Sequence, residues 1–276
     1  MSESPYSSWL VASDIDGTLL DKKRKLPLAN YKAVLDFVNK GGTFTLASDR
    51  NPESMGFHYN KLPIFGVPAI VMGGAGIYDF VKEKMLWFKP LSENSIKSAV
   101  EIGSKFPTVD TIINTKDNLY ISGIGFWAKF YLNAEKVSHK YFRYLNEVPT
   151  DDWAKVVFFG PMWRIKQLKK VLLDVPDREY SVIDSSIVSV QIQAKGANKG
   201  TAVLKLCEIL GIDPSHTAAI GDYYNDYKML SKVEISGCTA SSPKPLKRIA
   251  DYVSCHNNDG AVADFLGYLE SRVIEK

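Results

Sequence analysis

Three things that this sequence of 276 residues has little of restrict what the protein can be. It has three cysteines, Cys207, Cys238 and Cys255, and their wide separation and odd number argue against a disulfide framework or a zinc site and fit a reducing compartment. It has no apolar run long enough to cross a bilayer, and its polar N-terminus lacks the apolar core of a signal peptide. We therefore expect a cytoplasmic protein without a membrane partner.

The third thing that the sequence has little of is net charge. The formal net charge of +3 is small for this length, and the basic run at residues 22–25 is the one feature that favours nucleic acid. That run lies between a predicted strand and a predicted helix, so a solvated loop is the simpler interpretation, although it could attract an anion to a nearby site. We expect no nucleic-acid partner, and a monomer or a weak homo-oligomer.

Apolar runs and helical stripes alternate in the first and last parts of the chain. The ranges 9–12, 43–47, 69–72 and 216–220 have the pattern of strands, and 28–38, 203–210 and 262–269 have helical spacing. This alternation implies a parallel sheet with helices on its faces. The length suggests about two domains. We predict an α/β fold with a doubly wound, mostly parallel sheet, formed by residues 1–88 and 194–276.

The middle of the chain has a different pattern. Between residues 89 and 193, strand-like runs and helices follow one another with hairpin-like connections, which favours an inserted α+β domain. This range includes an aromatic-rich stretch, which we interpret as core or helix-packing residues rather than a cofactor site, because aromatic side chains prefer burial. Its members are Trp127, Phe130, Tyr131, Tyr141, Phe142 and Tyr144.

Polar residues follow the predicted strands of the α/β part. Asp14 and Asp16 come after the first strand, Ser48 after the second, and the turn at residues 221–226 after the strand 216–220, while Lys199 begins a helix. Because the carboxyl ends of strands form the ligand crevice of open parallel sheets, all of these can converge. Each one taken alone is more simply a turn, a helix cap or a surface lysine.

Gathered carboxylates need a counter-ion. Two of them about 4 Å apart repel by roughly 4 kcal/mol at an effective dielectric constant of 20. Asp14, Asp16, Asp222 and Asp226 therefore predict a hard divalent cation, and oxygen ligands favour Mg²⁺. The four histidines of the chain lie outside these turns, which disfavours zinc.

A cation beside a lysine and a hydroxyl suits a phosphoryl group, whose oxygens need positive charge and hydrogen-bond donors as the group transfers. An aspartate can attack phosphorus and form an aspartyl-phosphate. A second carboxylate two residues away could protonate the leaving oxygen and then activate water.

These segments, in their order along the chain, resemble the four motifs of the haloacid dehalogenase-like (HAD) superfamily. They are Asp14-Ile15-Asp16-Gly17-Thr18-Leu19, Ser48, Lys199-Gly200 and Gly221-Asp222-x-x-Asn225-Asp226. The matched frame covers nearly the whole chain. The resemblance implies a Rossmann-like HAD core, and the insert looks like the type-two cap of the Cof-like (IIB) sugar-phosphatase branch.

The resemblance also implies roles for single residues. Asp14 would be the nucleophile and Asp16 the general acid and base, with Ser48 and Lys199 holding the phosphoryl oxygens. Asp14, Asp222 and the backbone carbonyl of Asp16 would bind Mg²⁺, supported by Asn225 and Asp226. The candidate set is catalytic Asp14, Asp16, Ser48 and Lys199; phosphate- or substrate-binding Ser48, Asp49, Arg50, Lys199 and Asn225; and metal-binding Asp14, Asp16, Asp222 and Asp226.

The chain departs from the family pattern at three places. Ser48-Asp49-Arg50 stands where relatives usually have Thr-Gly-Arg, so the hydroxyl is kept while a carboxylate replaces a glycine beside the phosphate pocket. We expect Asp49 either to point away or to alter which substrates are accepted. The other two departures, at residues 73–75 and 239–240, concern substrate selection and support of the site.

The sequence thus predicts a magnesium-dependent phosphatase acting on small phosphorylated metabolites, sugar phosphates above all, through an aspartyl-phosphate. A phosphomutase on the same scaffold is one alternative. A catalytically inactive protein that binds a phospho-ligand and regulates another process is a second, motivated by Asp49 and the altered loops.

Overall fold

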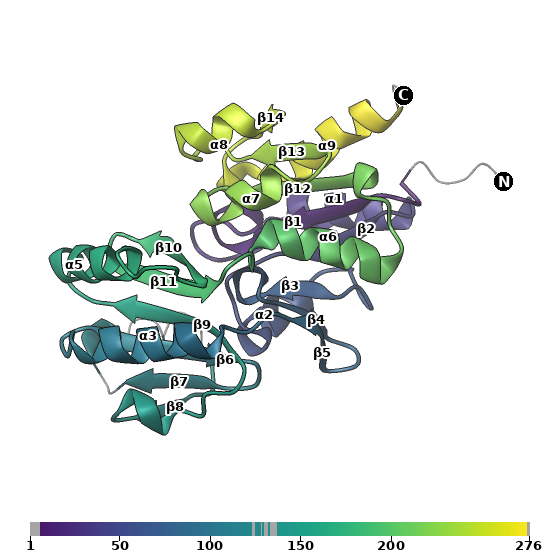
Figure 1. The fold of residues 1–276 in the computed structure, drawn as a ribbon. Coiled ribbons are helices and arrows are strands. Elements are labelled where there is room, and N and C mark those ends of the chain that lie inside the picture. The colour runs from purple at the N-terminus through teal and green to yellow at the C-terminus, as the bar shows by residue number, and fades with distance from the viewer. Residues whose placement is uncertain (1–5, 123–124, 128, 130–131, 133–136, 275–276) are drawn as a thin grey trace. The chain divides into compact units, whose positions relative to one another are not determined.

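The computed structural model describes residues 6–122, 125–127, 129, 132 and 137–274. The chain forms two compact units (Figure 1), which we call the core unit, Met1–Leu86 with Asn198–Lys276, and the insert unit, Trp87–Ala197. The predicted boundaries were 88 and 194. Two polypeptide crossings therefore connect the units.

A parallel sheet forms the centre of the core unit. Its strand order is β14-β13-β12-β1-β2, every neighbouring pair is parallel, and a bridge from Ala47 to Ile70 continues it to β3. The α/β prediction is confirmed. The strands are β1 Leu10–Ser13, β2 Thr43–Leu46, β12 Thr217–Gly221, β13 Ile235–Cys238 and β14 Tyr252–Val253, and β3 Ala69–Val71 forms a separate three-stranded sheet with β4 Gly76–Asp79 and β5 Lys84–Phe88.

Helices cover both faces of this sheet, as a doubly wound fold requires. Figure 1 shows α6 and α7 on one face and α1 and α9 on the other. Asparagine side chains begin two of the helices: Asn51 accepts the backbone N–H of Ser54 before α2, and Asn198 that of Thr201 before α6. The helices are α1 Leu28–Asn39, α2 Pro52–Tyr59, α6 Lys199–Leu210, α7 Tyr227–Leu230, α8 Lys244–Ile249 and α9 Ala261–Ile274, with short turns η1 Ile15–Leu19, η2 Met72–Gly74, η4 Pro214–His216, η5 Tyr224–Asp226 and η6 Asn257–Asp259.

The insert unit contains a six-stranded sheet of order β10-β11-β9-β6-β7-β8, antiparallel except for the parallel pair β7–β8. Helix α3 packs on one face, where Gly103 lies against Phe158 and Thr111. The elements are α3 Glu93–Ser104, β6 Asp110–Thr115, β7 Leu119–Ser122, β8 Lys140–Phe142, η3 Leu145–Glu147, β9 Trp153–Phe159, α5 Met162–Leu173, β10 Tyr180–Ser186 and β11 Ser189–Ala194.

The aromatic stretch of the insert is only partly core. Phe142 is buried and Tyr141 is more than half exposed, because β8 is an edge strand whose alternate residues face solvent. Tyr144, which follows the end of β8, is also more than half exposed. Trp127 is partly exposed, and Phe130 and Tyr131 lie outside the described residues.

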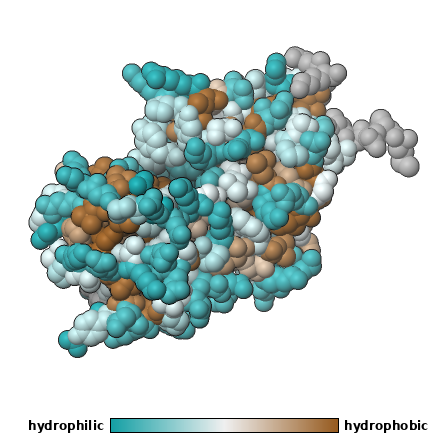
Figure 2. Space-filling model, in the orientation of Figure 1, coloured by the Kyte–Doolittle hydropathy of each residue, from teal (hydrophilic) through white to brown (hydrophobic). Residues whose placement is uncertain are grey.

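Hydrophilic side chains cover most of the face drawn in Figure 2, with smaller apolar patches between them. Across the described part of the chain, no helix combines the length and the apolar composition needed to cross a bilayer.

Candidate active site

The turn after β1 gives different surroundings to Asp14 and Asp16, which have one residue between them in the sequence. β1 ends at Ser13, the backbone N–H of Asp14 donates to Ile220 on β12, and η1 begins at Ile15. The Asp14 side chain is buried at 6% exposure, while that of Asp16 is 43% exposed. The two carboxylates therefore have different partners and different access to solvent.

Gly17 allows this turn to approach the loop after β12. Its φ of +89° is unfavourable for any residue with a Cβ, and a Cβ there would lie 2.4 Å from Asp222 Oδ2. The hydroxyl of Thr18 donates to Asp222 Oδ1 at 3.0 Å. Residues of the first motif thus hold the aspartate of the fourth.

Lys199 is the centre of a buried charge cluster. It begins α6 with a side chain 1% exposed, and its Nζ donates to Asp14 Oδ1 at 2.5 Å and to Asp226 Oδ1 at 2.6 Å. Burial by itself lowers the pKa of this lysine, but the carboxylates of Asp14 and Asp226 outweigh burial and raise it. The two carboxylates therefore favour the charged form of Lys199.

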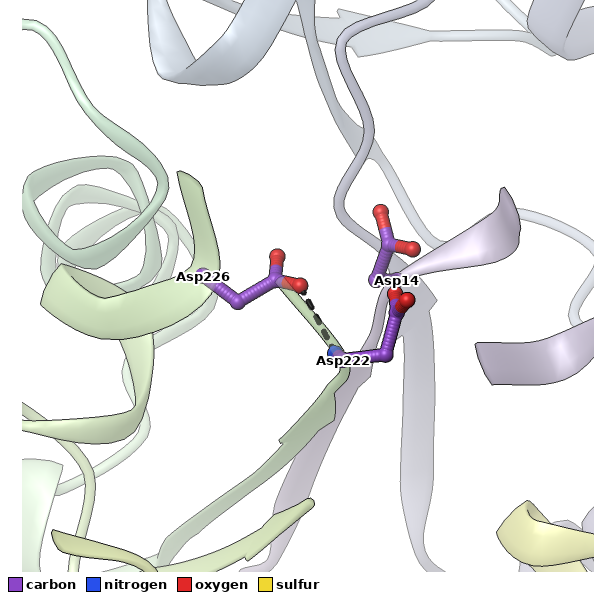
Figure 3. Close-up of side chains that lie close together, drawn as sticks. All are labelled: Asp14, Asp222 and Asp226. Atoms are coloured by element: carbon purple, nitrogen blue, oxygen red, sulfur yellow. Dashed lines mark hydrogen bonds between the residues drawn. The ribbon is translucent and has the colours of Figure 1, made fainter. Parts of the chain in front are cut away.

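Asp226 supports the loop that carries Asp222. Its Oδ2 accepts the backbone N–H of Asp222 at 2.9 Å (Figure 3). The same oxygen accepts the backbone N–H of Tyr223 at 3.2 Å, and Oδ1 accepts from Lys199. Both oxygens thus have donors already. The geometry favours Asp226 as a structural support and leaves Asp14 and Asp222 as the side chains better placed to bind a cation.

One oxygen from each of Asp14, Asp222 and Asp226 lies within 4.8 Å of the others, on loops that follow β1 and β12. Burial raises the pKa of Asp14, and the carboxylates of Asp226 and Asp222 raise it further against the effect of Lys199. Burial, together with Asp226, raises the pKa of Asp222 to about 6. These carboxylates repel one another more than one lysine compensates, and all of them offer oxygen, so the donor set fits Mg²⁺.

The second-motif loop contributes a different ion pair. Arg50 donates from Nε to Asp16 Oδ2 at 2.8 Å and from Nη2 to Asp16 Oδ1 at 2.9 Å, and its Nη1 donates to Ser54 on α2 at 2.6 Å. Such a two-pronged contact fixes the orientation of a carboxylate. The sequence predicts that Arg50 binds phosphate or substrate, which stays a prediction; in the structure its guanidinium holds Asp16.

Ser48 lies at the same sheet edge, just beyond β2. Its side chain is buried, its backbone bonds to Ile70 and Gly73, and its hydroxyl accepts the backbone N–H of Arg50 at 3.3 Å. The hydroxyl hydrogen is free to rotate, so Ser48 can donate to an anion.

Asp49 and Asn225 contact each other: Asn225 Nδ2 donates to Asp49 Oδ2 at 2.6 Å. Asp49 does not have a positive φ, so the glycine that relatives usually carry is not required here for the backbone. The sequence placed both residues near phosphate but gave no sign that they pair with each other.

Gly74, in the altered segment 73–75, packs against the start of α6. A Cβ there would lie 2.2 Å from the backbone carbon of Asn198, and its φ is +90°. This close approach helps to place Lys199. The sequence marked Gly73 and Gly74 as unusual but did not indicate the contact of Gly74 with Asn198. It also gave no role to Thr18 or Ser54, because their hydrogen-bond partners depend on tertiary geometry.

The fold and the site define a class of protein: an α/β enzyme of the hydrolase type, with aspartates and a lysine at the carboxyl edge of a parallel sheet. The sequence model of the haloacid dehalogenase-like hydrolase family matches residues 11–266, and the chain belongs to this family. The family prediction is confirmed.

Individual relatives share low sequence identity with this chain. A putative phosphatase of Streptococcus pyogenes is 26% identical over 267 residues, which are 92% of this chain and 95% of that protein. The fold of a haloacid dehalogenase-like hydrolase from Bacteroides thetaiotaomicron matches with a TM-score of 0.85 at 19% identity, covering 95% of this chain and 99% of the other. A subclass IIB sugar phosphatase of the HAD superfamily matches with a TM-score of 0.82 at 18% identity, covering 95% and 99%.

Proposed function

We propose that this protein is a magnesium-dependent phosphatase that hydrolyses small phosphorylated metabolites, with sugar phosphates as the leading class. The observation that carries the proposal is the buried contact of Lys199 with Asp14 and Asp226 beside Asp222. A divalent cation would compensate the negative charge of the aspartates, and Lys199 would compensate negative charge on a phosphoryl group. The curated relative from Streptococcus pyogenes bears the name of a putative phosphatase, which agrees with it.

Asp14 is the proposed nucleophile. Among the described residues Lys199 donates to Asp14 Oδ1 and no side chain donates to Oδ2, which leaves one oxygen to form a bond to phosphorus. As that bond forms, the bond from phosphorus to the ester oxygen breaks and an aspartyl-phosphate results. The ammonium of Lys199 lowers the pKa of Asp14 against burial and the neighbouring carboxylates, and a bound cation would act in the same direction, towards the ionised form that a nucleophile needs.

Asp16 is the proposed proton carrier. It delivers a proton to the leaving ester oxygen, and it then takes one from the water that attacks the aspartyl-phosphate, which releases inorganic phosphate and regenerates Asp14. Its side chain is 43% exposed, so substrate and water can reach it, and Arg50 holds it in one orientation.

The phosphoryl oxygens would receive donors from Ser48 and Lys199. Asp14, Asp222 and the backbone carbonyl of Asp16 would hold Mg²⁺, which when bound offsets the negative charge of the phosphoryl group and the carboxylates. We assign the sugar-phosphate class by analogy with the subclass IIB sugar phosphatase that shares the fold, and the insert unit is the proposed cap.

The test is hydrolysis of p-nitrophenyl phosphate by the wild-type protein and by Asp14→Asn, each with Mg²⁺ and with EDTA. We expect Asp14→Asn to lose at least about a thousandfold in kcat, because removal of a covalent nucleophile costs several kcal/mol of barrier. Asp184→Asn is the control: this carboxylate forms an exposed ion pair with Lys169 in the insert unit, and its removal should leave activity within about twofold.

Activity that survives both EDTA and Asp14→Asn would contradict the mechanism. A folded wild-type protein that binds Mg²⁺ yet hydrolyses no phosphate ester would favour the regulatory alternative, and a phosphorylated isomer as product would favour the phosphomutase. A screen of phosphorylated metabolites then identifies the substrate.

A further inference from the structure

Asp49 and Asn225 join two loops of the core unit that both enter the candidate site. Asp49 follows Ser48 beyond β2, and Asn225 lies in η5, directly before Asp226. The residues are 176 positions apart in the sequence, and their side chains meet at 2.6 Å. Their contact therefore links the second motif to the fourth.

The chemistry of Asp49 decides which way the Asn225 amide faces. An ionised carboxylate only accepts hydrogen bonds, whereas a primary amide has a donor nitrogen and an acceptor oxygen. If the amide were reversed, two acceptor oxygens would lie 2.6 Å apart and repel. Asn225 must therefore give its nitrogen to Asp49 and keep its carbonyl oxygen for another partner.

No group in the described part of the chain donates to that carbonyl oxygen. Asn225 Oδ1 is buried from solvent and has no hydrogen-bond partner. A buried acceptor without a donor costs free energy, and a ligand that brings a donor recovers it. The unpaired atom is thus an acceptor on the loop that carries Asp222 and Asp226.

We propose that Asp49 is a positioning residue that turns the Asn225 amide so that its carbonyl oxygen is the acceptor for an O–H donor. The donor is either a hydroxyl of the leaving group or a water held by the cation. This role rests on the proposed phosphatase function, although the orientation of the amide does not. It narrows the prediction that Asp49 and Asn225 bind phosphate or substrate, and it leaves the phosphoryl oxygens to Ser48 and Lys199.

The decisive test exchanges the two side chains. Asn225→Asp alone puts two carboxylates side by side and should lower kcat/KM at least about tenfold. In the double variant Asp49→Asn with Asn225→Asp, the amide at position 49 donates to the carboxylate at position 225, whose second oxygen is still an acceptor. The double variant should recover most of the loss. If Asn225 instead donates to phosphate, the double variant stays as impaired as Asn225→Asp, and the proposal is wrong.

A second pair of variants separates the hydrogen bond from the charge. Asp49→Leu removes the acceptor, and Asp49→Asn removes the charge but keeps an acceptor oxygen of the same size. We expect Asp49→Leu to be impaired about tenfold and Asp49→Asn to stay within about threefold of wild type. An equal loss in both variants would mean that only the charge matters, which contradicts the proposal.

Two measurements on these variants identify the donor. If it is water on the cation, calorimetric titration with Mg²⁺ alone should show weaker binding by Asp49→Leu than by Asp49→Asn. If it is a hydroxyl of the substrate, Mg²⁺ affinities stay equal, and KM rises for the metabolite found in the screen but not for p-nitrophenyl phosphate. Equal values in both measurements would overturn the proposal.

The side-chain amide resonance of Asn225 provides a readout that needs no activity. It is assigned by its loss in Asn225→Asp, and Asp49→Leu should shift it and speed its hydrogen exchange. A resonance that does not respond would show that the bond to Asp49 is absent and would overturn the proposal. A shifted resonance in a protein that hydrolyses no ester would instead locate the failure in the proposed function, and the Mg²⁺ titration would then decide the role of Asn225.

Discussion

The core unit and the insert unit both bury polar side chains, but they surround them differently. In the core unit, Lys199, Asp14 and Asp226 are almost fully buried and contact one another as opposite charges. In the insert unit, Asn114, Lys155 and Gln193 form a row across β6, β9 and β11, with exposures of 1%, 3% and 0%. Asn114 has no hydrogen-bond partner at either amide atom among the described residues.

This difference predicts how each unit responds when a buried polar side chain is replaced. A buried ion cluster is costly to assemble, and removal of one member leaves an uncompensated charge, so such clusters persist where chemistry needs them. A buried amide without partners reduces stability, and it gains a partner only if something binds there. The core unit is therefore sensitive to loss of charge, whereas Asn114 in the insert unit is open to apolar replacement.

Lys199→Met gives the largest expected effect. Without the ammonium, Asp14 and Asp226 repel each other in a buried site, and the free energy of unfolding in EDTA should fall by about 3–5 kcal/mol. Urea denaturation measures the loss, and Mg²⁺ should recover part of it because a cation replaces the missing charge. Lys205→Met is the control, since that lysine pairs with Glu208 on the exposed side of the same helix. Equal, small losses in both variants would show that the core unit is not sensitive to loss of its buried charge.

A pH-dependent effect of intermediate size should come from His58 on α2. Burial lowers its pKa to about 4, and Arg50, Lys61 and Arg24 act in the same direction, against Asp16. Because the pKa in the folded state is below the ordinary value of 6.5, the unfolded state binds the proton more readily. The stability that this histidine contributes is complete above about pH 6.5 and is lost as the pH falls through 4.

The difference in free energy of unfolding between the wild type and His58→Gln should therefore fall by about 3 kcal/mol between pH 7 and pH 4. Titration of other groups is common to both proteins and cancels in this difference. A difference that does not change with pH would mean that His58 is accessible to solvent in the folded protein.

The convergence at the site could be predicted because it follows from chain order. Asp14, Ser48 and Asp222 each come directly after a strand, and parallel strands put their carboxyl ends at one edge whatever the details of packing. The charges then imply a cation. The structure adds that Asp226 supports the loop of Asp222 and that both of its carboxylate oxygens already accept hydrogen bonds.

Other contacts could not be predicted. That Arg50 reaches Asp16, and Asn225 reaches Asp49, depends on how two turns close on each other, and the side-chain types allow several pairings. The row in the insert unit depends on the register of strand pairing. A change of register by one residue would give every residue of the strand a different cross-strand neighbour. Asn114 and Gln193 are ordinary strand residues in the sequence, and only the register brings them beside Lys155.

The comparison becomes sharpest when the same substitution is made in both units. Asn30 in the core unit and Asn114 in the insert unit are equally buried, but Asn30 donates to the carbonyl of Leu19 at 2.8 Å and accepts the N–H of Ala263 at 2.9 Å. Leucine has nearly the shape of asparagine. Asn30→Leu removes the partners of the buried Leu19 carbonyl and of the partly buried Ala263 N–H, and it should lower the free energy of unfolding by about 2–4 kcal/mol.

Asn114→Leu removes two polar atoms that lack partners in the described residues, so it should leave stability unchanged or raise it by about 1 kcal/mol. Thermal and urea denaturation of both variants measure the contrast. A loss at Asn114 as large as that at Asn30 would show that a bound molecule or ordered water pairs with the Asn114 amide in solution. The row in the insert unit would then be a binding surface, and the Asn114 amide would not reduce stability in solution.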